Sequence, residues 1–286
     1  MLRIACRASA LAQIQAHLIG QALLVDYELI TCSTAGDRNQ AQALAAIGGK
    51  GLFVKEVEQA LLAGAADIAV HSLKDMPVVQ PSNLPIVAYS SREVVNDVLI
   101  GADSWQELPR NAKVGTCSPR RQFQMQILRP DLEFQVLRGN INTRINKLKT
   151  SELSAIILAE AGLVRANITE PYTRFAIAEM LPAAGQGILA IQARPGLEFD
   201  LSPINNTAAA NAAKAERSIV EYLGANCHSP LAVYAHSGGN IYTIEVKAGN
   251  AENLVSICKI GANYEQAIAL TKQALNESPI KSIINS

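Results

Sequence analysis

The sequence is poor in features that would place the protein in a specialised class. Aromatic residues make up only 5% of its 286 residues, and Lys plus Arg (25) equals Asp plus Glu (25). Few aromatic platforms and no net charge argue against binding of nucleic acid or of an anionic membrane surface. No apolar run approaches the ~20 residues that span a bilayer. With 49% hydrophobic residues and no low-complexity tract, the chain is predicted to be globular throughout.

Cysteines are also few, and the five present are scattered along the chain. Their number is odd and no two form a Cys-x-x-Cys pair, so neither a disulfide framework nor structural zinc is predicted. Residues 1–7 alternate and carry charge where a secretory signal needs an apolar core. We therefore expect a cytoplasmic protein with reduced thiols and no bound metal.

Length and pattern predict more than one domain. Short apolar runs alternate with helical patterns as far as residue 192, which is typical of βα units and largely parallel sheets. An Ala-rich helix (Thr207–Leu223), three strand-like segments and a closing helix (Tyr264–Leu275) then predict a small α+β domain. The other expected helices are Leu11–Leu24, Phe53–Leu62, Gln122–Leu128, Thr143–Lys149 and Gly162–Asn167. The expected strands are Leu2–Ala5, Glu28–Thr31, Ile68–Val70, Val98–Ile100, Val114, Phe134–Leu137, Ala155–Leu158, Ile188–Gln192, Leu231–Ala235, Tyr242–Val246 and Val255–Cys258.

Polar motifs lie just past the carboxyl ends of five of these strands, at the edge where open α/β sheets bind ligands. Helices that begin there offer free N–H groups to anions. Guanidinium groups bind carboxylates bidentately, so a ligand with several carboxylates is predicted. Any one of these basic residues, taken singly, fits a solvated surface charge better. The basic residues in or near the loops are Arg7, Lys74, Arg120, Arg121, Arg138, Arg144 and Arg165.

The order and spacing of the motifs resemble the porphobilinogen deaminase (hydroxymethylbilane synthase) family. The similarity runs from Leu2 to about Pro230, and eight motifs in register make chance a poor explanation. The motifs are Gly48–Phe53, His71–Pro77, Gly115–Arg121, Leu137–Asn140, Thr143-Arg144, Ala161–Arg165, Pro182–Gly187 and the loop around Cys227.

The resemblance implies an α/β fold of two periplasmic-binding-protein-like lobes, with mainly parallel sheets, and a small C-terminal α+β domain. The implied lobe one comprises residues 1–91 and 188–205, lobe two residues 94–183, and the third domain residues 208–286. The implied activity is the deamination and head-to-tail joining of four porphobilinogen molecules into hydroxymethylbilane, as in haem biosynthesis. The family also implies a monomer without nucleic-acid or membrane partners.

Two residues are implied to carry the chemistry. Asp75 is the implied catalytic carboxylate, although by itself it reads as a helix N-cap before Pro77. Cys227 is implied to hold a dipyrromethane cofactor through a thioether, although a lone cysteine is more often a small buried hydrophobe. A hydrolase dyad of Cys227 with His228 is disfavoured because adjacent side chains rarely face each other.

The resemblance also implies which residues hold the cofactor and the substrate. The implied cofactor-binding residues are Ser72, Lys74, Thr116, Ser118, Arg120, Arg121, Asn140 and Arg144. The implied substrate-binding residues are Arg7, Ser9, Gln15, Arg138 and Arg165. Lys50, in a Gly-rich loop, is expected to cover the site, and Gly185–Gly187 to form a hinge.

The sequence departs from the family pattern at several positions. Ala46 and Asn96 replace a frequent Lys and Arg, Ala10 a frequent Pro, and Cys117 a frequent Ser. Ala225-Asn226 replaces a pair that contains glycine. None of these changes removes a proposed catalytic group. One rival remains at this point, a non-catalytic two-lobed binding protein for a polycarboxylate; it leaves the cysteine-bearing third domain unexplained.

Overall fold

A computed structural model describes residues 1–33, 54–250 and 253–285 of the chain. The chain divides into two compact units. Unit 1 comprises Met1–Glu93 and Gly187–Ala210, and unit 2 comprises Val94–Gln186 and Asn211–Ser286. The chain therefore passes three times from one unit to the other.

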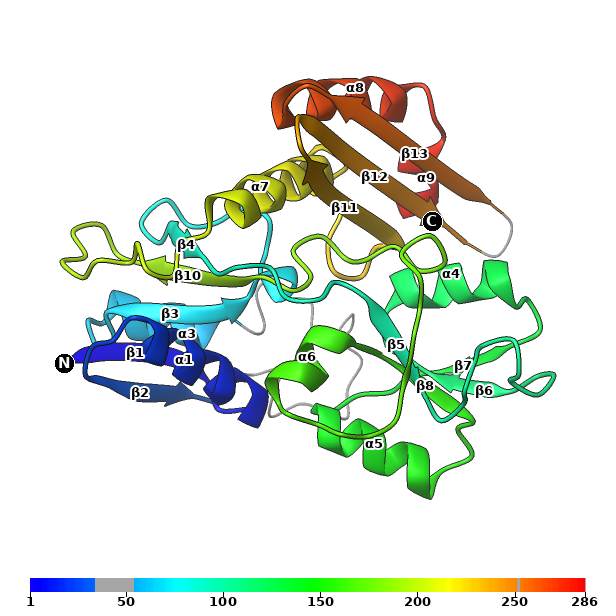
Figure 1. The fold of residues 1–286 in the computed structure, drawn as a ribbon, viewed down its shortest axis with the longest axis horizontal. Helices are drawn as coiled ribbons and strands as arrows, with labels where there is room; N and C mark the ends of the chain where they lie inside the picture. The colour runs from blue at the N-terminus through cyan, green and yellow to red at the C-terminus, as the bar shows by residue number, and fades with distance from the viewer. Residues whose placement is uncertain (34–53, 251–252, 286) are drawn as a thin grey trace. The chain divides into compact units, whose positions relative to one another are not determined.

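Unit 1 is built on one five-stranded sheet. Its elements are β1 (Leu2–Arg7), α1 (Ala10–Ala22), β2 (Tyr27–Cys32), α3 (Lys55–Leu62), β3 (Ile68–Ser72), the short 3-10 helix η1 (Leu73–Asp75), β4 (Ile86–Tyr89) and β10 (Leu189–Ala193). The strand order is β2-β1-β3-β10-β4 (Figure 1). β1 is parallel to β2 and β3, whereas β10 is antiparallel to β3 and β4.

Alternation along the strands divides the core of unit 1 into two layers, because successive side chains point to opposite faces of a sheet. Ile4 and Val70 pack in the layer that α1 covers, together with Ile19 of that helix. Ala5 packs in the other layer, together with Leu61 of α3. The small alanines on this second face allow α3 to lie close to the sheet.

The ends of β1 and β3 lie side by side at one edge of this sheet. β2 and β3 flank β1 on its two sides, so consecutive connections run in opposite directions from β1. Ligands bind at such a switch point, beyond the carboxyl ends of the strands. Arg7 is the last residue of β1 and Ser72 the last of β3, so both stand at this edge.

Unit 2 contains a second five-stranded sheet. Its elements are β5 (Asp97–Ile100), β6 (Lys113–Gly115), α4 (Pro119–Leu128), β7 (Glu133–Gln135), α5 (Ile141–Thr150), β8 (Ala155–Ala159), α6 (Glu160–Arg165) and β9 (Thr173–Arg174). The order is β7-β6-β8-β5-β9. β6 is parallel to β7 and β8, and β5 is antiparallel to β8 and β9. The sheet of unit 2 thus repeats the scheme of unit 1, with three parallel strands and then antiparallel ones.

The rest of unit 2 forms a three-stranded antiparallel sheet in the order β11-β12-β13. The elements of this part are α7 (Thr207–Tyr222), whose first residues belong to unit 1, β11 (Leu231–Gly238), β12 (Ile241–Gly249), β13 (Leu254–Gly261), α8 (Tyr264–Asn276) and α9 (Ile280–Asn285). α8 packs against β12 and β13. The fully buried Glu216 of α7 accepts hydrogen bonds from the backbone N–H of Gly185 (2.6 Å) and of Ala235 (2.8 Å). This carboxylate ties α7 both to β11 and to the segment that leads back to β10.

The predicted fold class is confirmed: two α/β sheets with flanking helices precede a small α+β domain. The five-stranded sheets are mixed, however, where mainly parallel sheets were expected. The antiparallel strands are those near the crossings: β5 follows the first crossing and β10 follows the second. The boundaries of the three predicted domains stay a prediction.

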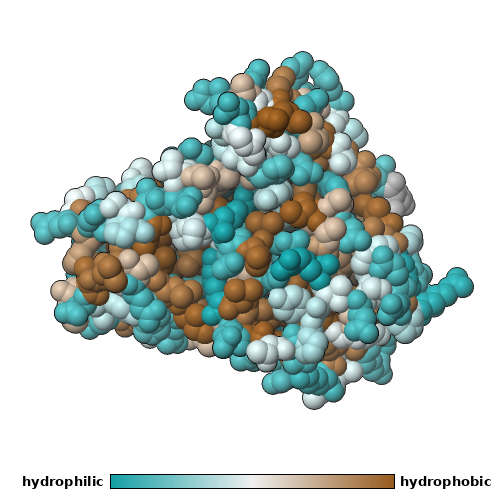
Figure 2. Space-filling model, in the orientation of Figure 1, coloured by the Kyte–Doolittle hydropathy of each residue, from teal (hydrophilic) through white to brown (hydrophobic). Residues whose placement is uncertain are grey.

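The surface of the described residues is mixed in character. Figure 2 shows hydrophilic and hydrophobic side chains interspersed on the face that it presents. Some large apolar side chains are exposed beside helix and strand ends, such as Leu24 (91%) and Val136 (74%). Within the described ranges, no helix combines the length and apolar character needed to cross a bilayer.

Candidate active site

Five of the predicted residues line one pocket, which lies within unit 1. They are Arg7, Ser9, Gln15, Ser72 and Asp75. Residues 7 and 9 lie at the end of β1 and in the turn after it, and residues 72 and 75 lie at the end of β3 and in the turn after it. The two turns meet because β1 and β3 are paired in parallel. The structure thus brings together the predicted catalytic carboxylate and three of the five predicted substrate-binding residues.

Local backbone geometry fixes the position of Asp75 in the turn that follows β3. It is the last residue of η1, and Met76 is extended (φ −85°, ψ 143°), the conformation favoured before Pro77. The chain does not continue into a helix there, so Asp75 is no helix N-cap. Its exposed side chain lines the pocket. Lys74 lies in the same turn and is partly exposed.

The first turn of α1 holds the other side of the pocket. Ser9 is the N-cap residue of α1 and has an extended backbone. Ala10, where the family often has Pro, is the first residue of the helix, a position at which proline is favoured but not required. Gln15, one turn further, is buried, and its Oε1 accepts a hydrogen bond from Oγ of Ser72 at 3.1 Å.

His71 also lines the pocket, although sequence analysis assigned it no role. The side chain is buried, and among the described residues its Nε2 has no hydrogen-bond partner. Burial, and to a smaller extent the charge of Arg7, lower the pKa of His71 to about 4, although the nearby amide of Gln192 opposes this shift. The imidazole is therefore neutral near pH 7. Apolar walls complete the pocket: Leu11, Ala12, Val54 and Val70.

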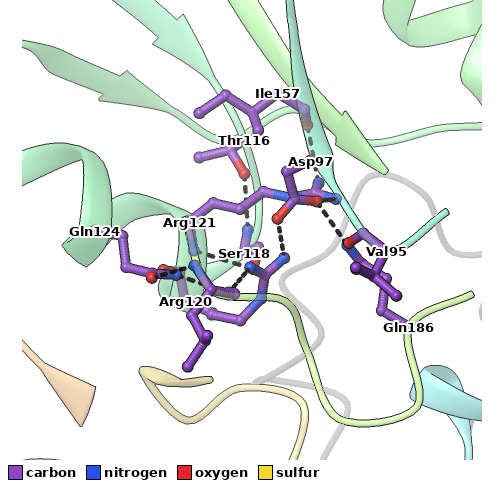
Figure 3. A network of polar contacts seen from close by, with 10 residues as sticks. Val95, Asp97, Thr116, Ser118, Arg120, Arg121, Gln124, Ile157 and Gln186 are labelled. Atoms are coloured by element: carbon purple, nitrogen blue, oxygen red, sulfur yellow. Dashed lines mark hydrogen bonds and ion pairs between the residues drawn. The ribbon is translucent and has the colours of Figure 1, made fainter. Parts of the chain in front are cut away.

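A buried ion cluster in unit 2 contains two predicted cofactor-binding residues, Arg120 and Arg121 (Figure 3). Nη2 of Arg120 lies 2.6 Å from Oδ2 of Asp97, and Nη2 of Arg121 lies 2.8 Å from Oδ1 of the same carboxylate. The two arginines and Asp97 are only 4%, 6% and 0% exposed. Burial lowers the pKa of Arg120, while the charge of Asp97 opposes that shift. The cluster contains two positive charges and one negative charge.

Backbone carbonyls and amides complete the cluster. Arg120 donates to the carbonyl oxygen of Leu181 (2.6 Å) and Arg121 to that of Ile157 (2.9 Å). The amide of the fully buried Gln186 donates to Oδ1 of Asp97 (3.1 Å) and to the carbonyl oxygen of Val95 (2.7 Å). Gln186, expected only as part of a hinge, is thus a member of this network.

Other predicted cofactor-binding residues shape the helix N-termini of unit 2. Ser118 caps α4, and its Oγ accepts from the backbone N–H of Arg121 (3.4 Å). Asn140 caps α5, and its Oδ1 accepts from the backbone N–H of Thr143 (2.9 Å). Such termini present free N–H groups to an anion. Thr116 is buried before α4, and Nε of Arg144 donates to the carbonyl oxygen of Gly139 (2.7 Å).

Two predicted substrate-binding residues, Arg138 and Arg165, also lie in unit 2. Arg138 is in the turn between β7 and α5, and Arg165 is the last residue of α6. Both are partly buried. They stand beyond the carboxyl ends of β7 and β8, where the sequence placed them, but in a different unit from the pocket that contains Arg7.

Cys227 is exposed in the loop between α7 and β11. Gly224, with φ +63°, follows the end of α7, a conformation that favours glycine. Asn226 then accepts a hydrogen bond at Oδ1 from the backbone N–H of His228 (2.8 Å), which closes a tight turn around the cysteine. The replacement of a glycine-containing pair by Ala225-Asn226 is therefore compatible with an ordered turn.

The remaining departures from the family pattern are partly explained. Asn96 donates from Nδ2 to the carbonyl oxygen of Phe175 (2.9 Å) and so fixes the start of β5. Cys117 is exposed just before the cap of α4. The expectations for Ala46 and Lys50 lie outside the described residues.

Known proteins resemble this chain over most of its length. The family model described as porphobilinogen deaminase, dipyromethane cofactor binding domain, matches residues 2–199. The protein named porphobilinogen deaminase from Campylobacter hominis is 46% identical over 259 residues, 87% of this chain and 84% of that protein. The one from Syntrophus aciditrophicus is 40% identical over 281 residues, 94% of this chain and 92% of that protein. Among solved structures, a periplasmic binding protein of Salmonella typhimurium is 12% identical with a TM-score of 0.38, covering 77% of this chain and 92% of that one.

Proposed function

The chain belongs to the porphobilinogen deaminase family, and on that premise we propose how its own residues carry out the reaction. The protein is a transferase that joins four porphobilinogen molecules head to tail into hydroxymethylbilane, with release of ammonia. The domain over residues 2–199 binds the dipyrromethane cofactor. A non-catalytic binding protein is not favoured, since relatives that cover most of the chain are named as deaminases.

The observation that carries the catalytic proposal is the meeting of Asp75 and Arg7 in one pocket of unit 1. Porphobilinogen must lose its amine as ammonia, which leaves a positive charge spread over the pyrrole and its methylene carbon. A carboxylate beside the pyrrole N–H stabilises that charge and accepts or returns a proton. We assign this role to Asp75, whose side chain is exposed to the pocket.

Substrate carboxylates need cationic and amide donors near that carboxylate. Arg7 supplies a guanidinium group, Ser9 a hydroxyl at the start of α1, and Gln15 an amide. The apolar walls formed by Leu11 and Val54 suit the faces of a pyrrole ring. Arg138 and Arg165 are proposed as further substrate contacts on the family resemblance alone.

The cofactor is a polyanion, since its two linked pyrroles carry acetate and propionate groups. The residues present in unit 2 fit such a group: the cluster of Arg120, Arg121 and Asp97 has one net positive charge, and the same unit contains the capped N-termini of α4 and α5. We propose that these arginines, with Thr116, Ser118, Asn140 and Arg144, hold cofactor carboxylates. Ser72 and Lys74 are proposed as further cofactor contacts on the family resemblance alone. When bound, the cofactor supplies the pyrrole carbon to which the first substrate is joined.

Attachment of the cofactor to Cys227 is proposed from the position of the thiol. Cys227 is exposed in a short ordered turn. A nucleophilic thiol must be accessible in this way to react with an electrophilic carbon. Cys6, by contrast, is buried, and burial raises its pKa to about 11, which makes its thiol a poor nucleophile. A monomer in the cytoplasm remains the prediction made from the sequence and the family.

Turnover of porphobilinogen tests the proposal. Purified protein should release hydroxymethylbilane and four equivalents of ammonia from four substrate molecules. Asp75→Asn should lose most of this turnover while keeping the cofactor in place. Stable binding of porphobilinogen without release of ammonia would contradict the catalytic assignment and favour a binding protein.

A further inference from the structure

The cluster around Asp97 poses an electrostatic problem. Two adjacent guanidinium groups that are about 95% buried repel each other, and removal from water penalises each of them. If the folded protein attaches its own cofactor, the two arginines are buried before any cofactor carboxylate is present. An internal counter-ion is therefore needed while no cofactor carboxylate is present.

Asp97 meets that need geometrically as well as electrically. Its Oδ1 accepts from Nε and Nη2 of Arg121 (3.1 and 2.8 Å), and its Oδ2 lies 2.6 Å from Nη2 of Arg120. One carboxylate thus bridges both arginines (Figure 3). Because Asp97 is the first residue of β5, the paired strand β8 holds the carboxylate in place.

Each guanidinium group is held at a second point, so its orientation is fixed. The carbonyl oxygen of Leu181 accepts from Arg120, and that of Ile157 accepts from Arg121. Gln124 reinforces the first contact: its Nε2 donates to the carbonyl oxygen of Leu181 (3.1 Å), and its Oε1 accepts from the backbone N–H of that residue (2.7 Å).

We propose that Asp97 is a positioning residue for cofactor acquisition: it orients Arg120 and Arg121 and offsets part of their buried charge in cofactor-free protein, and it leaves one net positive charge for a cofactor carboxylate. The inference rests on the proposed cofactor role of the two arginines. Gln186 supports Asp97 by donating a neutral hydrogen bond to Oδ1, which fixes the carboxylate without cancelling its charge. A second anion on the cluster makes it neutral and completes the site.

The test compares cofactor uptake in Asp97→Asn with that in wild-type protein. Cofactor-free protein is prepared from cells that make no porphobilinogen, then supplied with porphobilinogen, and the fraction with added mass is followed by intact-protein mass spectrometry. Asp67→Asn is the control, because Asp67 forms an ion pair of the same length with Arg3 (2.6 Å) in unit 1, although that pair is partly exposed. Uptake is measured well below each variant's melting temperature, where all of the protein is folded.

Asp97→Asn should take up the cofactor at least about tenfold more slowly than wild type, since the arginines lose their charge-assisted orienting bonds. Inorganic phosphate should raise its melting temperature more than that of wild type, because the cluster then carries two uncompensated charges. Uptake at the wild-type rate by fully folded Asp97→Asn would overturn the proposal, as a merely structural ion pair predicts that result. Asp67→Asn should load normally.

Two further variants keep the outcome decisive. If Asp97→Asn does not fold, Gln186→Met, which removes the neutral amide and leaves the three charged groups in place, should still slow uptake severalfold; uptake at the wild-type rate would overturn the proposal.

Replacing Asp97, Arg120 and Arg121 together by Leu removes the whole cluster. Normal loading of this triple variant would refute the cofactor role of the arginines, a failure of the proposed function. Impaired loading of the triple variant beside normal loading of Asp97→Asn would refute only the role of Asp97.

Discussion

Oγ of Ser72 donates a hydrogen bond to Oε1 of Gln15 at 3.1 Å, which links the end of β3 to α1 across the pocket of unit 1. With Oε1 engaged, the N–H groups of the Gln15 amide are left for the proposed contact with a substrate carboxylate. Ser72 is a proposed cofactor-binding residue and Gln15 a proposed substrate-binding residue. Because of their hydrogen bond, the orientation of the Gln15 side chain depends on Ser72.

Ser72→Ala should therefore raise the KM for porphobilinogen. Without the hydroxyl the Gln15 amide is no longer held in one orientation, and loss of its hydrogen bond to the substrate, at about 1.5 kcal/mol, corresponds to roughly tenfold weaker binding. Steady-state kinetics should show the change in KM with little change in kcat. Ser256→Ala, on the exposed side of β13, is the control; an unchanged KM in Ser72→Ala would show that the hydrogen bond does not orient Gln15.

Asp75→Asn should fold and melt like wild type yet lose about 10²–10⁴-fold in kcat, the range of a general acid–base group. The side chain is exposed, so the isosteric change disturbs no packing. Asp26→Asn, at an exposed aspartate between α1 and β2, should keep full activity. Retention of most turnover by Asp75→Asn would remove Asp75 from the mechanism.

His71 should make unit 1 sensitive to acid. Its pKa is about 4 in the folded protein against 6.5 in the unfolded chain, so the unfolded state binds the proton more readily. The stabilising contribution is complete above about pH 6.5 and is lost as pH falls toward 4. The loss amounts to about 3 kcal/mol.

Urea titrations between pH 7 and 4 test this contribution. His71→Gln should lower the free energy of unfolding at pH 7 and flatten its pH dependence over that interval. His17→Gln, at an exposed histidine of α1, should leave the slope unchanged. The same slope in His71→Gln as in wild type would show that another group accounts for the acid sensitivity.

The sequence predicted the pocket better than the ion cluster. Motifs after parallel strands converge by the geometry of the sheet, which is why Asp75 and Arg7 were placed at one edge. No role for Asp97 was predicted from the sequence. Its contact with Arg120 and Arg121 depends on the antiparallel pairing of β5 with β8, which no local pattern reveals. His71 was hidden in the same way, since strand alternation alone does not identify the pocket end of a buried strand.

Short elements were not predicted from the sequence, and one helix start was predicted too late because its capping residues were not considered. β4 and β9 have four and two residues, and α9 has six, too few for a clear period. α4 begins at Pro119, three residues before the predicted start. Ser118 as N-cap and Pro119 at the first helical position mark that start in the sequence.

Cys227→Ser should purify without a stable cofactor adduct, because a hydroxyl is a much weaker nucleophile than a thiolate near neutral pH. Mass spectrometry of the purified variant, and its reaction with Ehrlich's reagent, report the loss. Cys117→Ser is the informative control: this thiol is also exposed, and it lies in a proposed cofactor-binding loop. A full pyrrole colour in Cys227→Ser would move the anchor elsewhere.

The intact mass of the purified wild-type protein tests the central claim most directly. We predict a mass above that of the sequence by two linked pyrrole units, retained after denaturation and reduction, because a thioether is not exchanged by thiols. The added mass should map to the peptide that contains Cys227, and porphobilinogen should add further pyrrole units in steps of one. An adduct on Cys117, or protein of unmodified mass that still forms hydroxymethylbilane, would contradict the account.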